Sequence, residues 1–304
     1  MELTAGRISE IKTLLEEKEW YTEDFFNLYC KFISGFQSDK EINLILKLTR
    51  DFLWIKYEDY LKYLKELLNK IYIEENYLQK KTTIIIAPLL NFLDSDNNKV
   101  KSSNFLCYIF KSHEIQNLII FKNKKQKILE NVYSFNKNKI LEEIYSTNSD
   151  IYGEGIYSKK LRSFKKDILD DRLLILVDDF IGSGQTAQEA IDFYCNTCGF
   201  KKENIRILTF IIHNEGLNKI IKKGINKKYI YCIYKIKRSI SEGKYTEEDL
   251  KLMEKIEERL KINEKEKFGY AKSEALVTLI RTPNNTFPIF YKKNNNSLIP
   301  LFPR

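Results

Sequence analysis

The sequence predicts an α/β fold, with a mainly parallel sheet that carries helices on both faces and an α-helical domain before it. Two observations lead to this prediction. The first third of the 304-residue chain has apolar residues at intervals of three and four, as amphipathic helices do. From about residue 81 onward, short runs of β-branched and other apolar residues alternate with helical stretches, which is typical of βαβ units.

A helical N-terminal domain is expected over residues 1–80. Start signals for helices agree with the apolar spacing: Thr22 precedes two acidic residues, and Ser38 with Glu41 three positions later fits a capping box. A further amphipathic helix is expected over residues 57–71. We expect this domain to dock on the rest of the chain or to contact a protein partner.

An α/β domain of nucleotide-binding type is expected over residues 81–304, with a helical insertion at about 241–267 that packs on the sheet. Each predicted strand is a short apolar run. The predicted strands are 82–86, 118–121, 173–177, 205–212, 229–236 and 275–279. In the insertion, Thr246 stands before three acidic residues and is expected to cap the helix.

Composition narrows the class of protein. Hydrophobic residues make up 43% and charged residues 31% of the chain, as in ordinary globular proteins. Residues 1–20 do not resemble a signal peptide and no apolar run reaches transmembrane length, so we expect a cytoplasmic protein with no membrane association. Its five cysteines are then expected to be reduced, with Cys195 and Cys198 packed in a helix and not bound to metal.

The net charge of +9 has two interpretations. A lysine cluster within residues 122–127 could contact nucleic acid, whose phosphates attract such clusters. Asparagine accompanies lysine throughout the chain, however, as in proteins encoded by A/T-rich genes. This compositional bias favours a solvated basic surface over a nucleic-acid binding site.

One segment combines two acids with a small-residue loop. Residues 173–177 predict a buried strand, and Asp178 and Asp179 stand at its carboxyl end, where parallel sheets bind ligands. The loop that follows consists of Ile181, Gly182, Ser183, Gly184, Gln185 and Thr186. It leads into a predicted helix at 187–198. Glycines let backbone amides approach an oxyanion, hydroxyls add donors, and the helix N-terminus favours negative charge.

A phosphate-binding loop beside two carboxylates fits a ribose 5-phosphate, because carboxylates accept strong hydrogen bonds from vicinal hydroxyls. Two other phosphate motifs do not fit. A P-loop ends in Gly-Lys-Ser/Thr, which this segment lacks. A dinucleotide fingerprint needs a third glycine, which is also missing.

The run from Leu173 to Thr186 resembles the phosphoribosyl pyrophosphate signature of type I phosphoribosyltransferases. The resemblance implies that Asp178 and Asp179 contact the ribose hydroxyls and act in catalysis, and that residues 181–186 wrap the 5-phosphate. It also implies that Mg²⁺ bridges the pyrophosphate near the two acids without direct ligation by the protein. The implied activity is phosphoribosyl transfer, a glycosyltransferase reaction. The alternative is a non-catalytic sensor of phosphoribosyl pyrophosphate or a related nucleotide that regulates a partner.

One departure concerns Gly182, because many base-salvage members of that family have an acid there. Ordinary purine salvage is therefore the weaker expectation. The segments 268–277 and 282–289 resemble a narrower group, the phosphoribosyltransferase-like effectors of bacterial conflict systems. That resemblance implies a toxin effector in anti-phage (antiviral) defence, held by an operon-encoded protein partner.

Each of the remaining candidate site residues has two interpretations, one functional and one structural. Lys101, Ser102 and Ser103 precede a predicted helix at 104–111 and are either a pyrophosphate site or an ordinary helix cap. Tyr270, Asn284 and Asn285 are either part of an acceptor site or part of a polar turn built around Pro283. His213, at the end of a predicted strand, either faces the ligand crevice or has a structural role.

Overall fold

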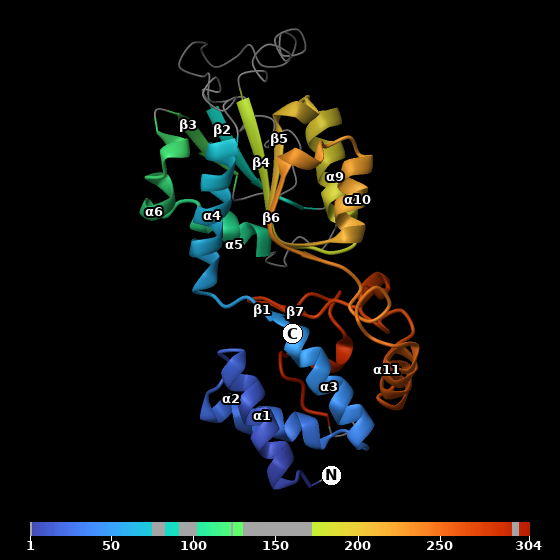
Figure 1. Ribbon diagram of the computed structural model, residues 1–304. Helices are drawn as coiled ribbons and strands as arrows, with labels where there is room; N and C mark the ends of the chain where they lie inside the picture. The colour runs from blue at the N-terminus through green and yellow to red at the C-terminus, as the bar shows by residue number, and fades with distance from the viewer. Residues whose placement is uncertain (1, 75–82, 91–101, 123, 130–171, 294–297) are drawn as a thin grey trace, which may run out of the picture. The chain divides into compact units, whose positions relative to one another are not determined.

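The computed structural model describes residues 2–74, 83–90, 102–122, 124–129, 172–293 and 298–304 (Figure 1). The chain forms two compact units. The first unit comprises residues 1–57 and 236–304, and the second comprises residues 58–235. The chain thus leaves the first unit once and returns to it, which differs from the single boundary near residue 80 that the sequence suggests.

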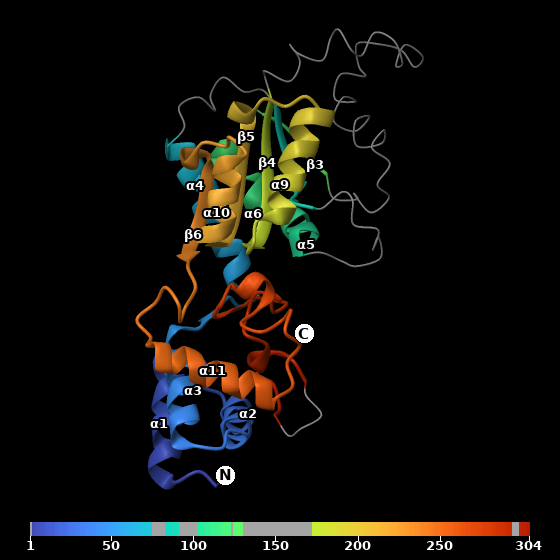
Figure 2. The same ribbon diagram turned by 90° about the vertical axis from the view of Figure 1, so that its right-hand side faces the viewer.

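The second unit is built on a five-stranded sheet with the order β3-β2-β4-β5-β6 (Figures 1 and 2). Its strands are β2 (Thr83–Pro88), β3 (Lys125–Ile128), β4 (Arg172–Ile181), β5 (Ile205–His213) and β6 (Ile230–Ile236). The pairs β2–β3, β2–β4 and β4–β5 are parallel. β2 and β5 are buried along their whole length, as expected for strands covered on both faces.

Helices cover both faces of this sheet (Figures 1 and 2). The helices are α4 (Asp59–Glu74), α5 (Ser102–Ile109), α6 (His113–Gln116), α9 (Gln185–Asp192) and α10 (Asn214–Lys222). On one face, Leu174 and Leu176 of β4 share a core with Ala190 of α9. On the other, Tyr60 of α4 meets Phe210 of β5, with ring centroids 4.8 Å apart. The predicted parallel α/β fold is confirmed.

The first unit is mainly helical. It contains α1 (Ala5–Glu17), α2 (Glu23–Ser34), α3 (Asp39–Asp51) and α11 (Glu247–Arg259), with a parallel pair of two-residue strands, β1 (Leu53–Trp54) and β7 (Val277–Thr278). The predicted caps form: the side chains of Thr22 and Thr246 accept hydrogen bonds from the third residue of each following helix. Among the helices of the described ranges, none is long and apolar enough to cross a membrane.

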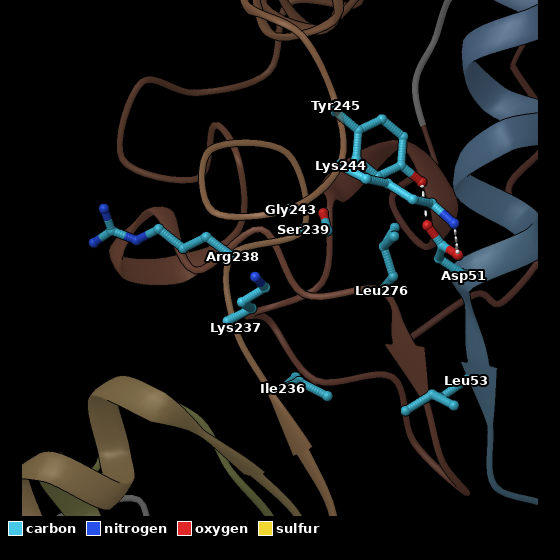
Figure 3. A pocket seen from close by; sticks show the side chains of 10 residues that line it. All are labelled: Asp51, Leu53, Ile236, Lys237, Arg238, Ser239, Gly243, Lys244, Tyr245 and Leu276. Atoms are coloured by element: carbon cyan, nitrogen blue, oxygen red, sulfur yellow. Dashed lines mark hydrogen bonds and ion pairs between the residues drawn. The ribbon is translucent and has the colours of Figure 1, made fainter.

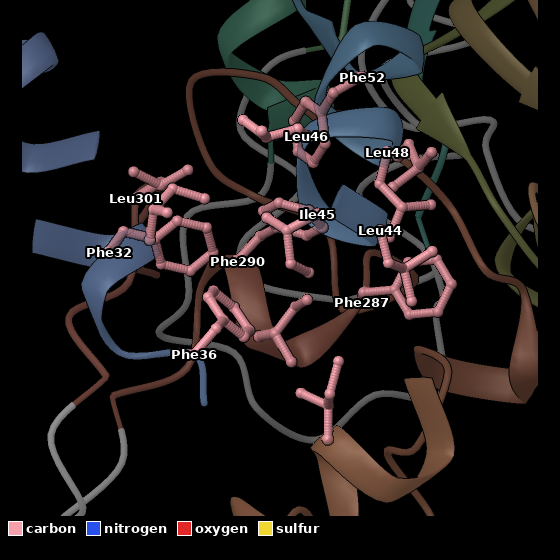
Figure 4. Packing of buried hydrophobic residues seen from close by; sticks show 14 of the residues in the cluster. Phe32, Phe36, Leu44, Ile45, Leu46, Leu48, Phe52, Phe287, Phe290 and Leu301 are labelled. Carbon is pink, nitrogen blue, oxygen red and sulfur yellow. The ribbon is translucent and has the colours of Figure 1, made fainter. Parts of the chain in front are cut away.

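Aromatic side chains from both ends of the chain form the core of the first unit (Figure 4). Phe52 lies 4.8 Å from Phe290 and 5.2 Å from Phe302 between ring centroids. Met253 and Ile256 of α11 join the same core. Because this cluster unites residues before position 57 with residues after position 236, the first unit needs both ends of the chain.

Three predictions about elements are wrong. The strand expected at 275–279 does not belong to the large sheet, because β7 pairs with β1 in the first unit. Residues 118–121 do not form a strand; Ile119–Phe121 is a 3-10 turn, and strand β3 follows at Lys125–Ile128. Among the described strands, β3 lies at the edge of the sheet and pairs with β2 alone, so it needs no continuous apolar run. The insertion at 241–267 does not pack on the large sheet, because α11 packs with α3 in the first unit.

Candidate functional site

The two acids lie where the strand order of the sheet changes direction. From β2 the chain goes to β3 on one side and then crosses to β4 on the other, which makes the carboxyl ends of β2 and β4 the usual ligand crevice of such sheets. Pairing of β4 with β2 ends at Val177 opposite Pro88. β4 then continues beside β5, with Asp178 opposite Thr209. The acids therefore begin at the first position of β4 beyond the end of β2.

The two carboxylates are held differently. Asp178 is half-buried, and its Oδ1 accepts hydrogen bonds from the Asp179 amide at 3.0 Å and from Ser102 Oγ at 3.3 Å. Asp179 is only 4% exposed, and its Oδ2 accepts a hydrogen bond from the Tyr60 hydroxyl at 2.7 Å. Asp178 is thus the acid nearer to solvent, and Asp179 is anchored to α4.

The surroundings of Asp178 and Asp179 raise the pKa of both side chains and so disfavour their ionised forms. Burial raises the pKa of Asp178 well above its ordinary value, and the neighbouring charge of Asp179 raises it further. Burial also raises the pKa of Asp179, against the effect of the Tyr60 hydrogen bond. Within the described part of the chain, no Lys or Arg forms an ion pair with either acid. The pair therefore favours a ligand that donates hydrogen bonds or brings a cation.

The loop after β4 is short and packs against α10. Gly184, which precedes the first residue of α9, has φ of 78°, a conformation that favours glycine. A Cβ on Gly184 would lie 2.7 Å from the Gly216 Cα, and a Cβ on Gly216 would lie 2.5 Å from the Gly182 carbonyl oxygen. Only glycine at both positions allows the loop to sit this close to α10.

The N-terminus of α9 has no side-chain cap among the described residues. The first helical hydrogen bond runs from Gln188 N to the Gly184 carbonyl at 3.0 Å. Amides before Gln188 therefore have no partner within the helix, and such groups bind anions. Ser183 is half-buried, Gln185 and Thr186 are exposed, and the Gln185 side-chain Nε2 donates to Glu189 Oε1 at 3.1 Å. The predicted loop thus presents its amides and hydroxyls at the end of β4.

The structure brings one of the predicted pyrophosphate residues to the acids. Ser102 is the first residue of α5 and contacts Asp178, as given above. Ser103 is buried in the same turn. Lys101 lies outside the described residues. Because α5 also packs against β2 and β4, Ser102 is part of the same crevice as the acids.

The predicted acceptor residues belong to the first unit, whereas the acids belong to the second. The Asn285 side-chain amide donates to the Tyr270 carbonyl at 3.2 Å and to Ser273 Oγ at 3.1 Å. The Tyr270 amide donates to the Asn284 carbonyl at 2.7 Å, and the Tyr270 side chain is 44% exposed. Asn285 therefore holds two chain segments together, which favours the polar turn over an acceptor role for this side chain.

His213 and the cysteine pair have structural surroundings. His213 is buried and caps α10, with Nδ1 accepting a hydrogen bond from the Glu215 amide at 3.2 Å. Cys195 lies in the π-helical turn Phe193–Thr197 that continues α9, and Cys198 follows it; neither cysteine forms a disulfide. Burial raises the pKa of Cys195. No group of three or more His, Cys, Asp or Glu side chains in the described ranges could hold a metal ion.

Tyr60 and Gly216 are two contributors that the sequence did not reveal. Tyr60 occupies an apolar position of its helix, so its spacing indicates only burial, and its hydrogen bond spans 119 positions of the chain. Gly216 stands within a helix, where glycine has no local reason to occur. No local sequence signal identifies either role, since each depends on a tertiary contact.

Comparison with known proteins identifies the family of the chain. A family model described as PRTase-CE matches residues 29–304, so the chain belongs to the PRTase-CE family. The predicted relationship to phosphoribosyltransferases is thereby confirmed. Among solved structures, the chain has a similarity at 27% identity and a TM-score of 0.19 to the crystal structure of APRTase from Giardia lamblia complexed with 9-deazaadenine. That match covers 21% of this chain and 34% of the other. No curated protein matches the chain.

Proposed function

We propose that the chain binds phosphoribosyl pyrophosphate with Mg²⁺ at the carboxyl end of β4 and transfers the phosphoribosyl group with release of pyrophosphate. The observation that supports this most is the juxtaposition of two features: an acid pair that has no cationic partner in the described part of the chain, and a glycine loop at a helix without a side-chain cap. The acids can bind hydroxyls and the loop can bind a phosphate, and a ribose 5-phosphate carries both groups.

Each part of the site has a role in this proposal. The amides of residues 182–186 bind the 5-phosphate, with the hydroxyls of Ser183 and Thr186 as further donors. Asp178 accepts a hydrogen bond from one ribose hydroxyl because it is the acid nearer to solvent. Asp179 accepts from the other hydroxyl, and Tyr60 keeps its carboxylate in place.

The acid pair also fits a magnesium ion that arrives with the ligand. Two buried carboxylates without a Lys or Arg partner in the described chain are stabilised by a nearby divalent cation. Mg²⁺ is commonly held by substrate phosphates together with few protein groups, which agrees with a position near Asp178 and Asp179. When bound, the ion neutralises charge on the pyrophosphate.

In the proposed reaction a nucleophile bonds to C1 of the ribose while the C1–O bond to pyrophosphate breaks. The bonding electrons leave with pyrophosphate, and positive charge develops on the ribose ring. The carboxylates of Asp178 and Asp179 stabilise that charge and hold the ring by its hydroxyls. A base, a nucleotide, a nucleic acid, a protein side chain or water would each serve as acceptor in this scheme.

We further propose that the protein acts in the cytoplasm as an effector of anti-phage defence. The support is the similarity of segments 268–277 and 282–289 to conflict-system effectors. A protein partner would bind the helices α1 to α3. Expression without the partner should arrest bacterial growth, and the Asp178→Asn/Asp179→Asn double variant should not.

Calorimetry with Mg²⁺ and phosphoribosyl pyrophosphate tests the binding site. Each charge-assisted contact contributes about 1.5–3 kcal/mol, so the double Asn variant should bind at least about a hundredfold more weakly. The Asn side chains keep size and hydrogen-bonding atoms, and the fold should persist. Equal binding by wild type and the double variant would show that the acids do not hold the ribose.

A pyrophosphate-release assay then separates an enzyme from a sensor. Release by the wild type and its loss in the double variant supports the transferase. Tight binding without release, in the presence of each acceptor class, supports a non-catalytic sensor.

A further inference from the structure

The first unit contains a pocket that has no part in the proposed function (Figure 3). Its volume is about 470 Å³, within the usual range of small-molecule sites. Three apolar side chains line it, those of Leu53, Ile236 and Leu276. All of its lining residues belong to the first unit.

A buried carboxylate outside the pocket lining, that of Glu274, holds the turn at Ser239 to Ser241. Glu274 Oε2 accepts hydrogen bonds from the amides of Ile240 and Ser241, both at 2.8 Å. The Ser241 hydroxyl donates to the other carboxylate oxygen, and the Ser239 amide donates to the Glu274 carbonyl at 3.3 Å. The turn that carries Ser239 is therefore fixed before any ligand arrives.

Asp51, which lines the pocket, fixes the side chains of Lys244 and Tyr245. Its two carboxylate oxygens accept hydrogen bonds from Lys244 Nζ at 3.0 Å and from the Tyr245 hydroxyl at 2.7 Å (Figure 3). The Tyr245 hydroxyl also lies 3.1 Å from the Lys47 carbonyl. These contacts hold the aromatic ring and neutralise the Lys244 ammonium, so neither is free to collapse into the pocket.

Two polar groups at the pocket, the Ser239 hydroxyl and the Lys237 ammonium, have no partner among the described residues. Ser239 Oγ is buried and makes no hydrogen bond in the described chain, and buried hydroxyls ordinarily have one. Lys237 forms no ion pair among the described residues, and Arg238 points away from the other lining side chains (Figure 3). Since Asp51 is matched by Lys244, the pocket has an excess of positive charge.

We propose that this pocket binds a small organic anion with a compact apolar body. The apolar body lies against Leu53, Ile236 and Leu276. The anionic group pairs with the Lys237 ammonium, and the Ser239 hydroxyl donates a hydrogen bond to the ligand. A preformed apolar pocket with a few convergent polar groups is the usual form of such a site.

The probe for this site is 8-anilinonaphthalene-1-sulfonate, an aromatic anion whose fluorescence rises in apolar surroundings. The full chain should bind it saturably, and Lys237→Gln should weaken this binding by about tenfold to a hundredfold, because a charge-assisted contact is lost. Ser239→Ala should weaken it by a smaller factor. Lys235→Gln is the matched control, since Lys235 is exposed, equally charged and two residues away from Lys237.

The outcomes decide the proposal independently of phosphoribosyl pyrophosphate binding. Selective weakening by Lys237→Gln supports the site, including in a chain that fails to bind phosphoribosyl pyrophosphate. Equal weakening by Lys235→Gln would mean diffuse charge attraction and would overturn the proposal. Absence of saturable binding to the folded wild type would overturn it as well. Unchanged melting temperatures of both Gln variants exclude unfolding as the cause.

Discussion

Two carboxylates, the buried Glu274 and the half-buried Asp178, have opposite surroundings in the two units. Glu274 of the first unit is 3% exposed and accepts three hydrogen bonds, two of them from backbone amides at 2.8 Å. Asp178 of the second unit accepts two longer ones and stands beside Asp179, a second buried acid. The first arrangement satisfies its charge within the protein, whereas the second leaves a negative pair that a ligand can satisfy.

The difference shows how to separate structural acids from ligand-binding acids. A carboxylate surrounded by donors stabilises the fold when it is ionised. A pair of adjacent buried carboxylates without cations opposes the folded state at neutral pH and is stabilised by what it binds. Stability and affinity should therefore respond differently to substitution in the two units.

The largest effect on the free energy of unfolding is expected for Glu257 in the first unit. One of its carboxylate oxygens accepts a hydrogen bond from the Phe268 amide at 2.8 Å, and the other has no partner among the described residues. Burial raises the pKa of Glu257 from 4.5 to about 8. The folded state then holds the proton more tightly than the unfolded state does.

The contribution of Glu257 to the free energy of unfolding is therefore fully present below the pKa that Glu257 has in the unfolded chain. This contribution is lost as the pH rises toward 8, the pKa in the folded state. The loss is about 1.4 kcal/mol per pH unit in this window. Glu257→Gln should remove this slope. Urea unfolding followed by tryptophan fluorescence tests it, because Trp20 and Trp54 both lie in the first unit. Parallel pH profiles for the two proteins would contradict the role of Glu257.

Glu274→Ala should destabilise the first unit by about 2–4 kcal/mol, since it leaves the buried Ile240 amide and the partly buried Ser241 amide without their acceptor. The same fluorescence measurement in urea gives the value. Glu242→Ala is the control, because Glu242 is exposed in the neighbouring turn. Affinity for phosphoribosyl pyrophosphate should stay unchanged if Glu274 is purely structural.

Gly216→Ala should weaken phosphoribosyl pyrophosphate binding by about tenfold or more. The added Cβ would lie 2.5 Å from the Gly182 carbonyl oxygen and push the loop away from α10. One or two hydrogen bonds between the loop and the 5-phosphate should then be lost. Gly6→Ala in α1 is the matched control for glycine replacement within a helix, as nothing lies within 4 Å of the added atom. Calorimetry should show normal affinity for that control and reduced affinity for Gly216→Ala.

Tyr60→Phe should have the smallest effect, about three- to tenfold on affinity, because one hydrogen bond to a carboxylate is lost while the aromatic contact stays. Tyr63→Phe controls for it. Tyr63 lies on the same helix and packs on the same Phe210, but its hydroxyl pairs with Tyr234 at 3.0 Å. Equal effects of the two substitutions would mean that Tyr60 affects binding through the packing of α4 and not through its hydrogen bond to Asp179.

Much of the fold could be predicted because its signals are local. Caps at Thr22 and Thr246, and the apolar runs of β4 and β5, depend on a few neighbouring residues, and all of them form. β3 was missed because an edge strand needs no apolar run. The division into units was not evident, because the contacts of Phe52 with Phe290 and Phe302 join distant parts of the chain.

The candidate site divides along the same line. Asp178, Asp179 and the loop at 181–186 are consecutive in the chain, so their spacing indicated a shared site. Tyr60 and Gly216 reach it from other elements, through contacts that no spacing indicates. Ser102 could be predicted only as one of two alternatives, because a serine at a helix start is also an ordinary cap.

The central claim is that Asp178 belongs to a ligand-binding acid pair, and the single variant Asp178→Asn tests it most directly. Burial and Asp179 raise the pKa of Asp178, so its ionised form opposes folding at neutral pH, and Asn should raise the melting temperature. Calorimetry with Mg²⁺ and phosphoribosyl pyrophosphate should show at least about tenfold weaker binding of the same variant. A more stable protein with weaker binding is the predicted result. A variant that melts lower and binds as tightly as wild type would contradict the account.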